Sequence, residues 1–411
     1  MTIAIIYMAE EFNWSPKIQG IISSSFYFGY FMTQIIGGAL TDKFGGKSVL
    51  GIAAVTWSLF TLITPIAARI NLYVLIMCRI CLGIGEGVCF PCVHSLVSKW
   101  FPPQERTRAA SAISVSNFIG LVIAMPISNL LGSSQLGWEC IFWVFSIIGL
   151  IWSVFWHFYG ESVPTDYSGI NKDELDWILE NKTSISKSTN ESIDCPENKI
   201  GHYRSCSSEC ITITDEELGR PRNENDMLLP KGRISSSSHK VHKIPWKLLF
   251  SRREVWAIMI GSLFNGWSHF VLLNWLPIFF YDHFHVDINL VGYYTVLPYF
   301  LYIITGAIVG CICDYAINQL KIRVLTVRRS VCIIGGFGMS LSLLLLDIAP
   351  KYAGFVYGLG GTFALIPAFF GVALTGWILE VTGNDWSIIW NMCSLCYIIG
   401  VSFFVCWAGG E

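Results

Sequence analysis

Long apolar stretches recur along this chain, and they restrict its possible folds more than any other feature. A helix that crosses a bilayer needs about 20 mostly apolar residues. Charged residues make up only 14% of the chain, against roughly 25% in an ordinary soluble domain. We therefore expect an all-α polytopic membrane protein rather than a soluble enzyme. The expected spans are Gly20–Leu40, Ser48–Ala68, Leu72–Val97, Ala109–Leu131, Cys140–Phe158, Val255–Phe280, Val291–Ala316, Val331–Leu346, Tyr352–Leu379 and Trp386–Trp407.

Most of the charge lies in one central stretch. Residues 159–254 hold 14 of the 27 Lys and Arg residues and 16 of the 29 Asp and Glu residues. This composition buries too little apolar surface to form a core, so we expect a largely disordered connector. The connector divides the chain into an N-terminal bundle, residues 1–158, and a C-terminal bundle, residues 255–411. Its beginning, Asn171–Asn181, has apolar residues at helical spacing and predicts a short amphipathic helix.

The loops between the spans differ in basic charge, which predicts their orientation. Lys and Arg favour the cytoplasmic side in short loops. One side holds only Lys17 and Arg69. The other side holds Lys43, Lys47, Lys99, Arg106, Arg108, Lys321, Arg323, Arg328, Arg329 and Lys351. We expect these basic loops and the connector to lie on the cytoplasmic face.

Several function classes are excluded by composition. The net charge of −2 and the lack of a continuous basic stripe argue against nucleic acid as a partner. The 14 cysteines mostly stand singly inside apolar runs, where a thiol acts as a small hydrophobe, so we predict no metal site and no cofactor. No nucleophile and base recur together, so the chain is not expected to be an enzyme.

A glycine-rich helix end followed by an acid and bases occupies residues 37–47. Its glycines let neighbouring helices approach closely, and its charges can latch two helices together. We assign it as a gating loop, with a weaker copy after the second span of the other half. The residues assigned to the gating loop and its copy are Gly38, Asp42, Lys43, Gly45, Gly46, Lys47, Asp314, Arg328 and Arg329. Matching positions in two halves imply a repeat.

Together these features resemble the major facilitator superfamily. The sequence from Arg79 to Gly87, with Pro91, His94 and the loop up to Arg108, is similar to the fourth helix and following loop of solute carrier family 17, the sodium/anion cotransporters. Plastid phosphate transporters and vesicular glutamate transporters belong to this family. The resemblance covers nearly all the chain except the connector. It implies two helical bundles that move an anion by alternating access, with phosphate the first candidate and carboxylates the second, coupled to sodium or a proton.

Arg79 is the central candidate for substrate binding. A charge at the bilayer centre costs at least about 2.5–3.5 kcal/mol, so Arg79 needs a partner or a water-filled cavity. Glu86 follows about 10.5 Å along the same helix and within about 20° of the same face. The resemblance implies anion recognition for Arg79 and ion coupling or conformational change for Glu86. The alternative is a helix-to-helix salt bridge without substrate contact.

Three further polar residues are candidates. Asn265 and His269 are one helical turn apart and share a face, so we assign both to the substrate site. Vesicular glutamate transporters resemble this stretch but carry arginine at the Asn265 position, which weakens the case for a dicarboxylate. His269 has an unperturbed pKa of about 6.5, which suits a coupling proton, although a lone histidine is more often structural. His94 is assigned to coupling, with a packing role as the alternative.

The chain departs from the family in two places. It lacks most of the first helix, including an arginine, and about one helix before Asp347 in the C-terminal half. Either the sequence is an incomplete gene model or splice form, or the protein is a degenerate, non-transporting receptor or scaffold that signals through the connector. We expect a monomer whose partners are the bilayer and a small anion. The sequence leaves the plasma membrane, a plastid membrane and a vesicle membrane open.

Overall fold

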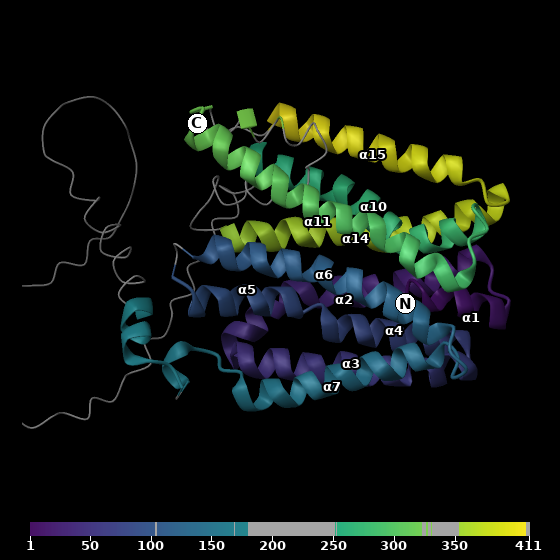
Figure 1. Ribbon diagram of the computed structural model, residues 1–411, viewed down its shortest axis with the longest axis horizontal. Coiled ribbons are helices and arrows are strands. Elements are labelled where there is room, and N and C mark those ends of the chain that lie inside the picture. Colours follow the sequence, from purple (N-terminus) through teal and green to yellow (C-terminus); the bar gives the residue numbers. More distant parts are fainter. Residues whose placement is uncertain are drawn as a thin grey trace, which may run out of the picture.

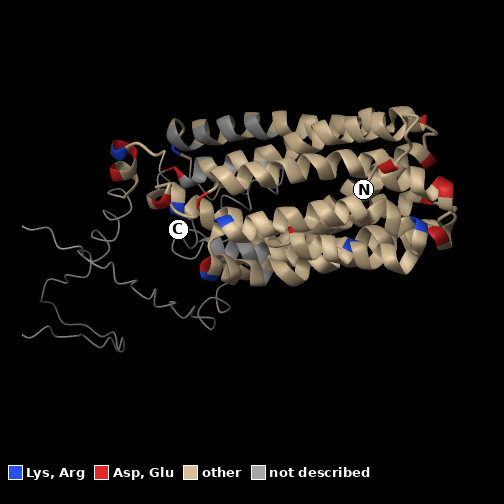
Figure 2. Cartoon of the chain, turned by 90° about the horizontal axis from the view of Figure 1, so that it is seen from below, with Lys and Arg blue, Asp and Glu red and all other residues tan. Residues whose placement is uncertain are grey.

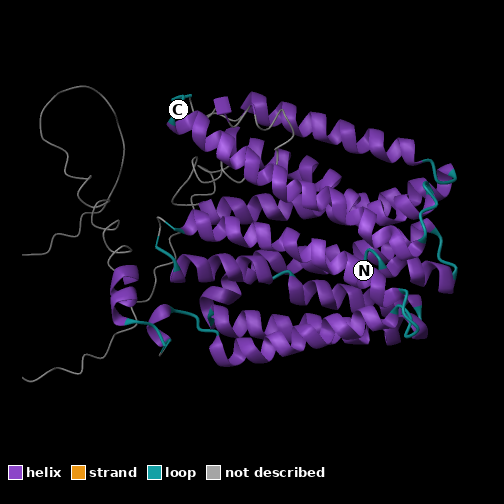
Figure 3. Cartoon of the chain, in the orientation of Figure 1, coloured by secondary structure: helices purple, strands orange, loops and turns teal. Residues whose placement is uncertain are grey.

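The computed structural model describes residues 1–102, 105–167, 169–179, 251, 253–322, 326–327, 330 and 353–407. Within these ranges every regular element is a helix (Figure 3). The first half contains α1 (Ala4–Phe12), α2 (Pro16–Phe44), α3 (Gly46–Ile70), α4 (Leu72–Glu86), α5 (Cys89–Trp100), α6 (Arg106–Gly132), α7 (Glu139–Tyr159) and η1 (Pro164–Asp166). The second half contains α10 (Arg253–Asp282), α11 (Ile288–Asn318), α14 (Ala353–Thr382) and α15 (Trp386–Trp407).

The helices begin and end at residues that cap or interrupt a helix. Pro16 lies in the first turn of α2, where its missing N–H is not needed. Gly45 ends α2 with a positive φ of 82°, a conformation that suits glycine. The side chains of Asn71 and Asp287 accept hydrogen bonds from the backbone N–H two residues on, which caps α4 and α11. These caps fix the short connections between successive helices.

Eight of the described helical segments are long and apolar enough to cross a membrane. They include α4 and α5, which together form one run, Leu72–Trp100, with Gly87 and Val88 as turn residues between them. The expected span Val331–Leu346 lies outside the described residues, as do residues 180–250 of the connector. Residues 172–179 at the start of the connector are helical, as their apolar spacing predicts.

The helix α2 covers the predicted span Gly20–Leu40 but is less apolar than these eight segments. It turns polar residues inward: Ser23, Ser24 and Ser25 are all buried. It packs against α4 on one side and α14 on the other. A helix surrounded by other helices can carry polar groups that a lipid-facing helix cannot.

The helices run lengthwise between two ends of the molecule (Figure 1). We call the end where α2, α5 and α7 finish the connector end, and the end where α3, α10 and α14 finish the far end. Helices from the first half pack together, as do those from the second half, and the halves meet where α2 contacts α14 and α6 contacts α11. The described basic residues Lys43, Lys47 and Lys99 belong to the connector end, as the loop asymmetry predicts.

The outer surface is that of a protein in lipid. Charged residues gather at the two ends of the bundle, and the sides are almost free of them (Figure 2). Large apolar side chains on these sides point outward, and Ile52, Ile147 and Leu395 are each more than half exposed. Such a surface is stable in contact with acyl chains and unfavourable in water. The chain is therefore a multi-pass membrane protein.

Candidate functional site

Arg79 lies on α4 and is buried, with 7% of its surface exposed. Its guanidinium carbon lies 5.2 Å from the centroid of the Phe26 ring on α2. Its Nε is buried without a hydrogen-bond partner, and no ion pair to Arg79 occurs within the described part of the chain. A desolvated cation–π contact contributes about 2 kcal/mol, which offsets only part of the cost of burying a charge. The Arg79 guanidinium therefore lacks a counter-charge among the described residues, and this position favours an anion.

Close contacts between α2 and α4 hold Phe26 against Arg79. A Cβ atom at Gly83 would overlap the carbonyl oxygen of Phe26, and one at Gly29 would overlap that of Ile80. A Cβ at Gly87 would likewise overlap backbone and side-chain atoms of α2. Glycine is therefore required at three levels of this helix pair, as in other close helix contacts in membranes.

Glu86 is the last residue of α4 and is half-buried. It forms no ion pair with Arg79, and no described residue donates a hydrogen bond to its carboxylate. Seven residues of helix separate the two groups by about 10.5 Å along the axis. His94 lies on α5, about two turns beyond Glu86, and is also half-buried.

His269 lies in an aromatic environment on α10. Its ring meets Phe118 of α6 at 6.4 Å and Phe270 at 5.1 Å, both edge to face. Phe118 in turn packs against Tyr302 of α11 at 4.5 Å. Asn265 is half-buried one turn earlier on α10. Among the described contacts, none joins Asn265 or His269 directly to Arg79.

The depth of each side chain in the bundle separates the candidates into two levels. Arg79 lies seven residues from the far end of its helix, and Tyr27, Asn274 and Tyr299 lie eight to eleven residues from the far ends of theirs. These positions correspond to about 10–17 Å from that end. The second level, nearer the connector end, holds Glu86, His269 and Asn265.

Sequence reasoning missed the partners of Arg79 at its own level. Phe26 and Tyr27 stand in an ordinary apolar run of α2, and nothing in that run marks one ring for a cation. Asn274 donates a hydrogen bond of 2.8 Å to the Tyr27 hydroxyl across the two halves. A buried asparagine in a membrane span is a signal that could have identified this position.

One basic residue of the gating loop, Lys47, forms an ion pair: its Nζ lies 2.8 Å from Oε1 of Glu161. Asp42 and Lys43 of the same loop are exposed. The Lys47 N–H also donates to the Ser162 hydroxyl at 3.1 Å. Glu161 and Ser162 follow α7, so the loop is tied to the beginning of the connector.

The glycines of the gating loop divide into two groups. A Cβ atom at Gly46 would overlap the Leu96 side chain, and one at Gly45 would lie 2.7 Å from the Ser162 hydroxyl. A Cβ at Gly38 would meet no atom of the described residues within 4 Å, so this glycine is not a point of close approach to them. In the second half, Asp314 lies in α11, and Arg328 and Arg329 lie outside the described residues.

Hydrogen bonds between the halves close the far end. Glu380 of α14 accepts from the Ser15 hydroxyl and, at 3.3 Å, from the backbone N–H of Lys17 at the start of α2. The Asn129 amide of α6 donates to the backbone carbonyl of Asn289 at the start of α11. Carboxylates near a helix N-terminus are favourably placed. The described contacts thus hold the halves together on the side opposite the connector.

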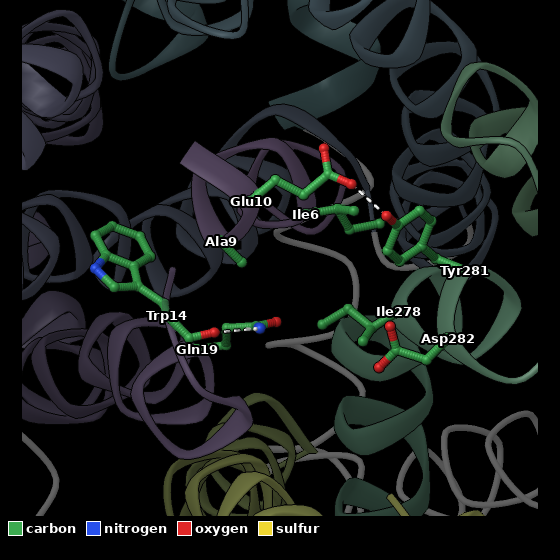
Figure 4. Close-up of a pocket in the computed structure, with 8 residues that line it drawn as sticks. All are labelled: Ile6, Ala9, Glu10, Trp14, Gln19, Ile278, Tyr281 and Asp282. Atoms are coloured by element: carbon green, nitrogen blue, oxygen red, sulfur yellow. Dashed lines mark hydrogen bonds between the residues drawn. The ribbon is translucent and has the colours of Figure 1, made fainter. Parts of the chain in front are cut away.

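A small pocket of about 180 Å³ lies at the far end between α1, α2 and α10 (Figure 4). Glu10 and Asp282 are among its lining residues, and Glu10 accepts a hydrogen bond from Tyr281 across the halves. Two carboxylates in one pocket repel an anion. Elsewhere, no three described His, Cys, Asp or Glu side chains are placed to hold a metal ion.

Comparisons with known proteins agree on one kind of molecule. A family model described as Major Facilitator Superfamily matches residues 1–347. The chain is 30% identical to "Probable anion transporter 4, chloroplastic" of Oryza sativa subsp. japonica, over 100% of this chain and 65% of that protein. It is 30% identical to "Ascorbate transporter, chloroplastic" of Arabidopsis thaliana, over 100% of this chain and 71% of that protein.

A further relative and a solved structure extend the comparison. "Sodium-dependent phosphate transport protein 1, chloroplastic" of Arabidopsis thaliana is 27% identical, over 100% of this chain and 75% of that protein. Among solved structures, a D-xylose-proton symporter matches with a TM-score of 0.60 at 13% identity, over 100% of this chain and 93% of that chain. At this identity the match concerns the fold alone.

Proposed function

The chain belongs to the Major Facilitator Superfamily, and from that premise we propose that it carries a small oxyanion across a membrane by alternating access, with Arg79 as the anion's principal partner. The observation that carries the proposal is the buried Arg79 guanidinium, which has the Phe26 ring beside it and no acidic partner among the described residues. A planar guanidinium holds two oxygens of a phosphate or carboxylate at once. An anion bound there would complete the site.

The names of the relatives support this substrate class. They include transporters of anions, ascorbate and phosphate. Phosphate is our first candidate and carboxylates are the second. Coupling to sodium or a proton through Glu86, with His94 and His269 as further candidates, is part of the proposal. Glu86 supports it because the carboxylate is half-buried and unpaired within the described residues.

The experiment is uptake into proteoliposomes of radiolabelled phosphate, ascorbate and glutamate under a sodium or pH gradient. Arg79→Ala should reduce uptake of the transported anion by at least about 100-fold, because two charge-assisted hydrogen bonds are lost at about 1.5–3 kcal/mol each. Arg79→Lys should recover only part, since lysine keeps the charge but loses the two-pronged geometry.

Arg69→Ala is the matched control. Arg69 lies in the last turn of α3, is exposed at the far end and, unlike Arg79, forms ion pairs, with Glu11 and Glu139. This variant should keep most of the uptake. Normal transport by Arg79→Ala would show that the arginine is structural. A wild-type protein that inserts correctly but takes up no anion would favour a receptor or scaffold.

A further inference from the structure

A buried hydrogen bond between Tyr27 of α2 and Asn274 of α10 joins the two halves of the chain. The Asn274 Nδ2 atom lies 2.8 Å from the Tyr27 hydroxyl oxygen and 2.8 Å from the backbone carbonyl oxygen of Phe270. A carbonyl oxygen only accepts hydrogen bonds, so the side-chain atom facing it must be the amide nitrogen. That nitrogen donates to both oxygens. The Tyr27 oxygen is therefore an acceptor, and its own hydrogen points elsewhere.

The Tyr27 hydroxyl hydrogen has no acceptor in the described part of the chain. Tyr27 and Asn274 are each only 7% exposed, so bulk water does not readily supply one. Buried polar groups are almost always paired, and each exception needs an explanation. A ligand that accepts the hydrogen would be such an explanation.

Tyr27 lies beside the proposed anion site. It directly follows Phe26, whose ring contacts Arg79, and the Tyr27 ring packs edge to face on that ring with the centroids 5.2 Å apart. Tyr299 of α11 is at the same level and has a buried hydroxyl that finds no hydrogen-bond partner among the described residues. Hydrogen-bond donors from three helices therefore gather at one depth.

We propose that Tyr27, oriented by Asn274, donates its hydroxyl hydrogen to the anion that Arg79 holds, and that this contact favours a phosphate-like oxyanion over a carboxylate. The guanidinium fork occupies two oxygens. A carboxylate group has only those two oxygens, so a second donor must share one of them with the fork, and the second carboxylate of glutamate lies three carbons away. A tetrahedral phosphate presents further oxygens to a second donor. The inference rests on the proposed function, because it assumes that the anion binds at Arg79.

The first test compares the KM values of phosphate and glutamate uptake into proteoliposomes. Tyr27→Phe removes only the hydroxyl and should raise the KM for phosphate about tenfold or more, with kcat little changed, since one hydrogen bond to a charged group is lost. The KM for glutamate should change by less than about threefold, which is no more than the loss of a weak, neutral hydrogen bond would cause. Tyr73→Phe, on an exposed tyrosine at the start of α4, should leave both values unchanged.

The second test asks whether Asn274 acts through Tyr27. Asn274→Ala should raise the KM for phosphate in the wild-type background but add nothing to Tyr27→Phe, because the oriented hydroxyl is already absent. Equal effects in both backgrounds would mean that Asn274 has a merely structural role and would overturn the positioning argument.

The possible outcomes distinguish this inference from the proposed function on which it rests. If the wild type takes up phosphate and Tyr27→Phe leaves its KM unchanged, the Tyr27 contact is refuted while anion transport stands. Uptake of glutamate without phosphate would overturn the inferred substrate class. If the wild type takes up neither anion nor ascorbate, the proposed function fails, and the inference fails with it.

Discussion

The replacement Gly83→Ala tests whether the contact between α2 and α4 is as close as the structure places it. The added Cβ would lie well inside the 3.0 Å that real Cβ contacts respect, and the obstacle is the Phe26 backbone carbonyl, which cannot rotate away. The helices would have to separate by about 1 Å to restore ordinary contact. Overpacking costs about 1–3 kcal/mol, against which alanine gains up to about 1 kcal/mol over glycine in a helix. Because the obstacle is a backbone atom, the cost lies at the upper end of that range, and we expect a net loss of about 2 kcal/mol.

Gly38→Ala is the matched control, because Gly38 lies on α2 and a Cβ there meets no atom of the described residues within 4 Å. Its helix-propensity gain of up to about 1 kcal/mol is unopposed. The two variants should therefore differ by about 3 kcal/mol, or roughly 3 °C in apparent melting temperature for a chain of this size. The assay is heating of the detergent-solubilised protein, followed by size-exclusion measurement of the surviving monodisperse fraction. Equal melting of the two variants, or higher melting of Gly83→Ala, would refute the close contact.

Two further predictions concern the far end and ion coupling. Glu380→Gln removes a charge from the contact with the start of α2. An impermeant thiol reagent should therefore modify a cysteine introduced as Ile278→Cys, which is buried in the far-end pocket, several-fold faster. Glu139→Gln, whose partner Arg69 lies in its own half, should not accelerate the modification, and equal acceleration by both variants would contradict the contact between the halves. Glu86→Gln should preserve exchange of labelled for unlabelled anion but abolish ion-driven accumulation, and a parallel loss of both would place Glu86 outside the coupling step.

The sequence predicted the helices well because a membrane span depends on local composition. Arg79 and Glu86 could be placed on one helix face from their spacing alone. Contacts between helices were not accessible in the same way, since apolar runs carry no information about the register of one helix against another. Asn274 and Tyr27 are 247 residues apart, and Lys47 and Glu161 are 114 apart. No local pattern links either pair.

The low hydropathy of α2 shows a second limit of the sequence. Its buried serines, Tyr27 and Tyr30 reduce its hydropathy, and they lie on a helix that packs between α4 and α14. Hydropathy measures how well a helix suits lipid and takes no account of packing against other helices. The glycines of residues 37–47 show the converse limit, because their spacing did not distinguish Gly46, which has a neighbour at close range, from Gly38, which has none among the described residues.

The glycine contacts between α2 and α4 also have a consequence for the timing of anion release. Because Gly29, Gly83 and Gly87 hold these helices in backbone contact, Arg79, Phe26 and Tyr27 move as one body. When the halves separate, Asn274 moves away from Tyr27 with the second half. The Tyr27 hydroxyl then loses the hydrogen bond that orients it and can rotate freely. If the anion binds as proposed, it then loses an oriented donor while the guanidinium stays in place. Its affinity would fall as the halves part, and by reciprocity a bound anion would keep them together.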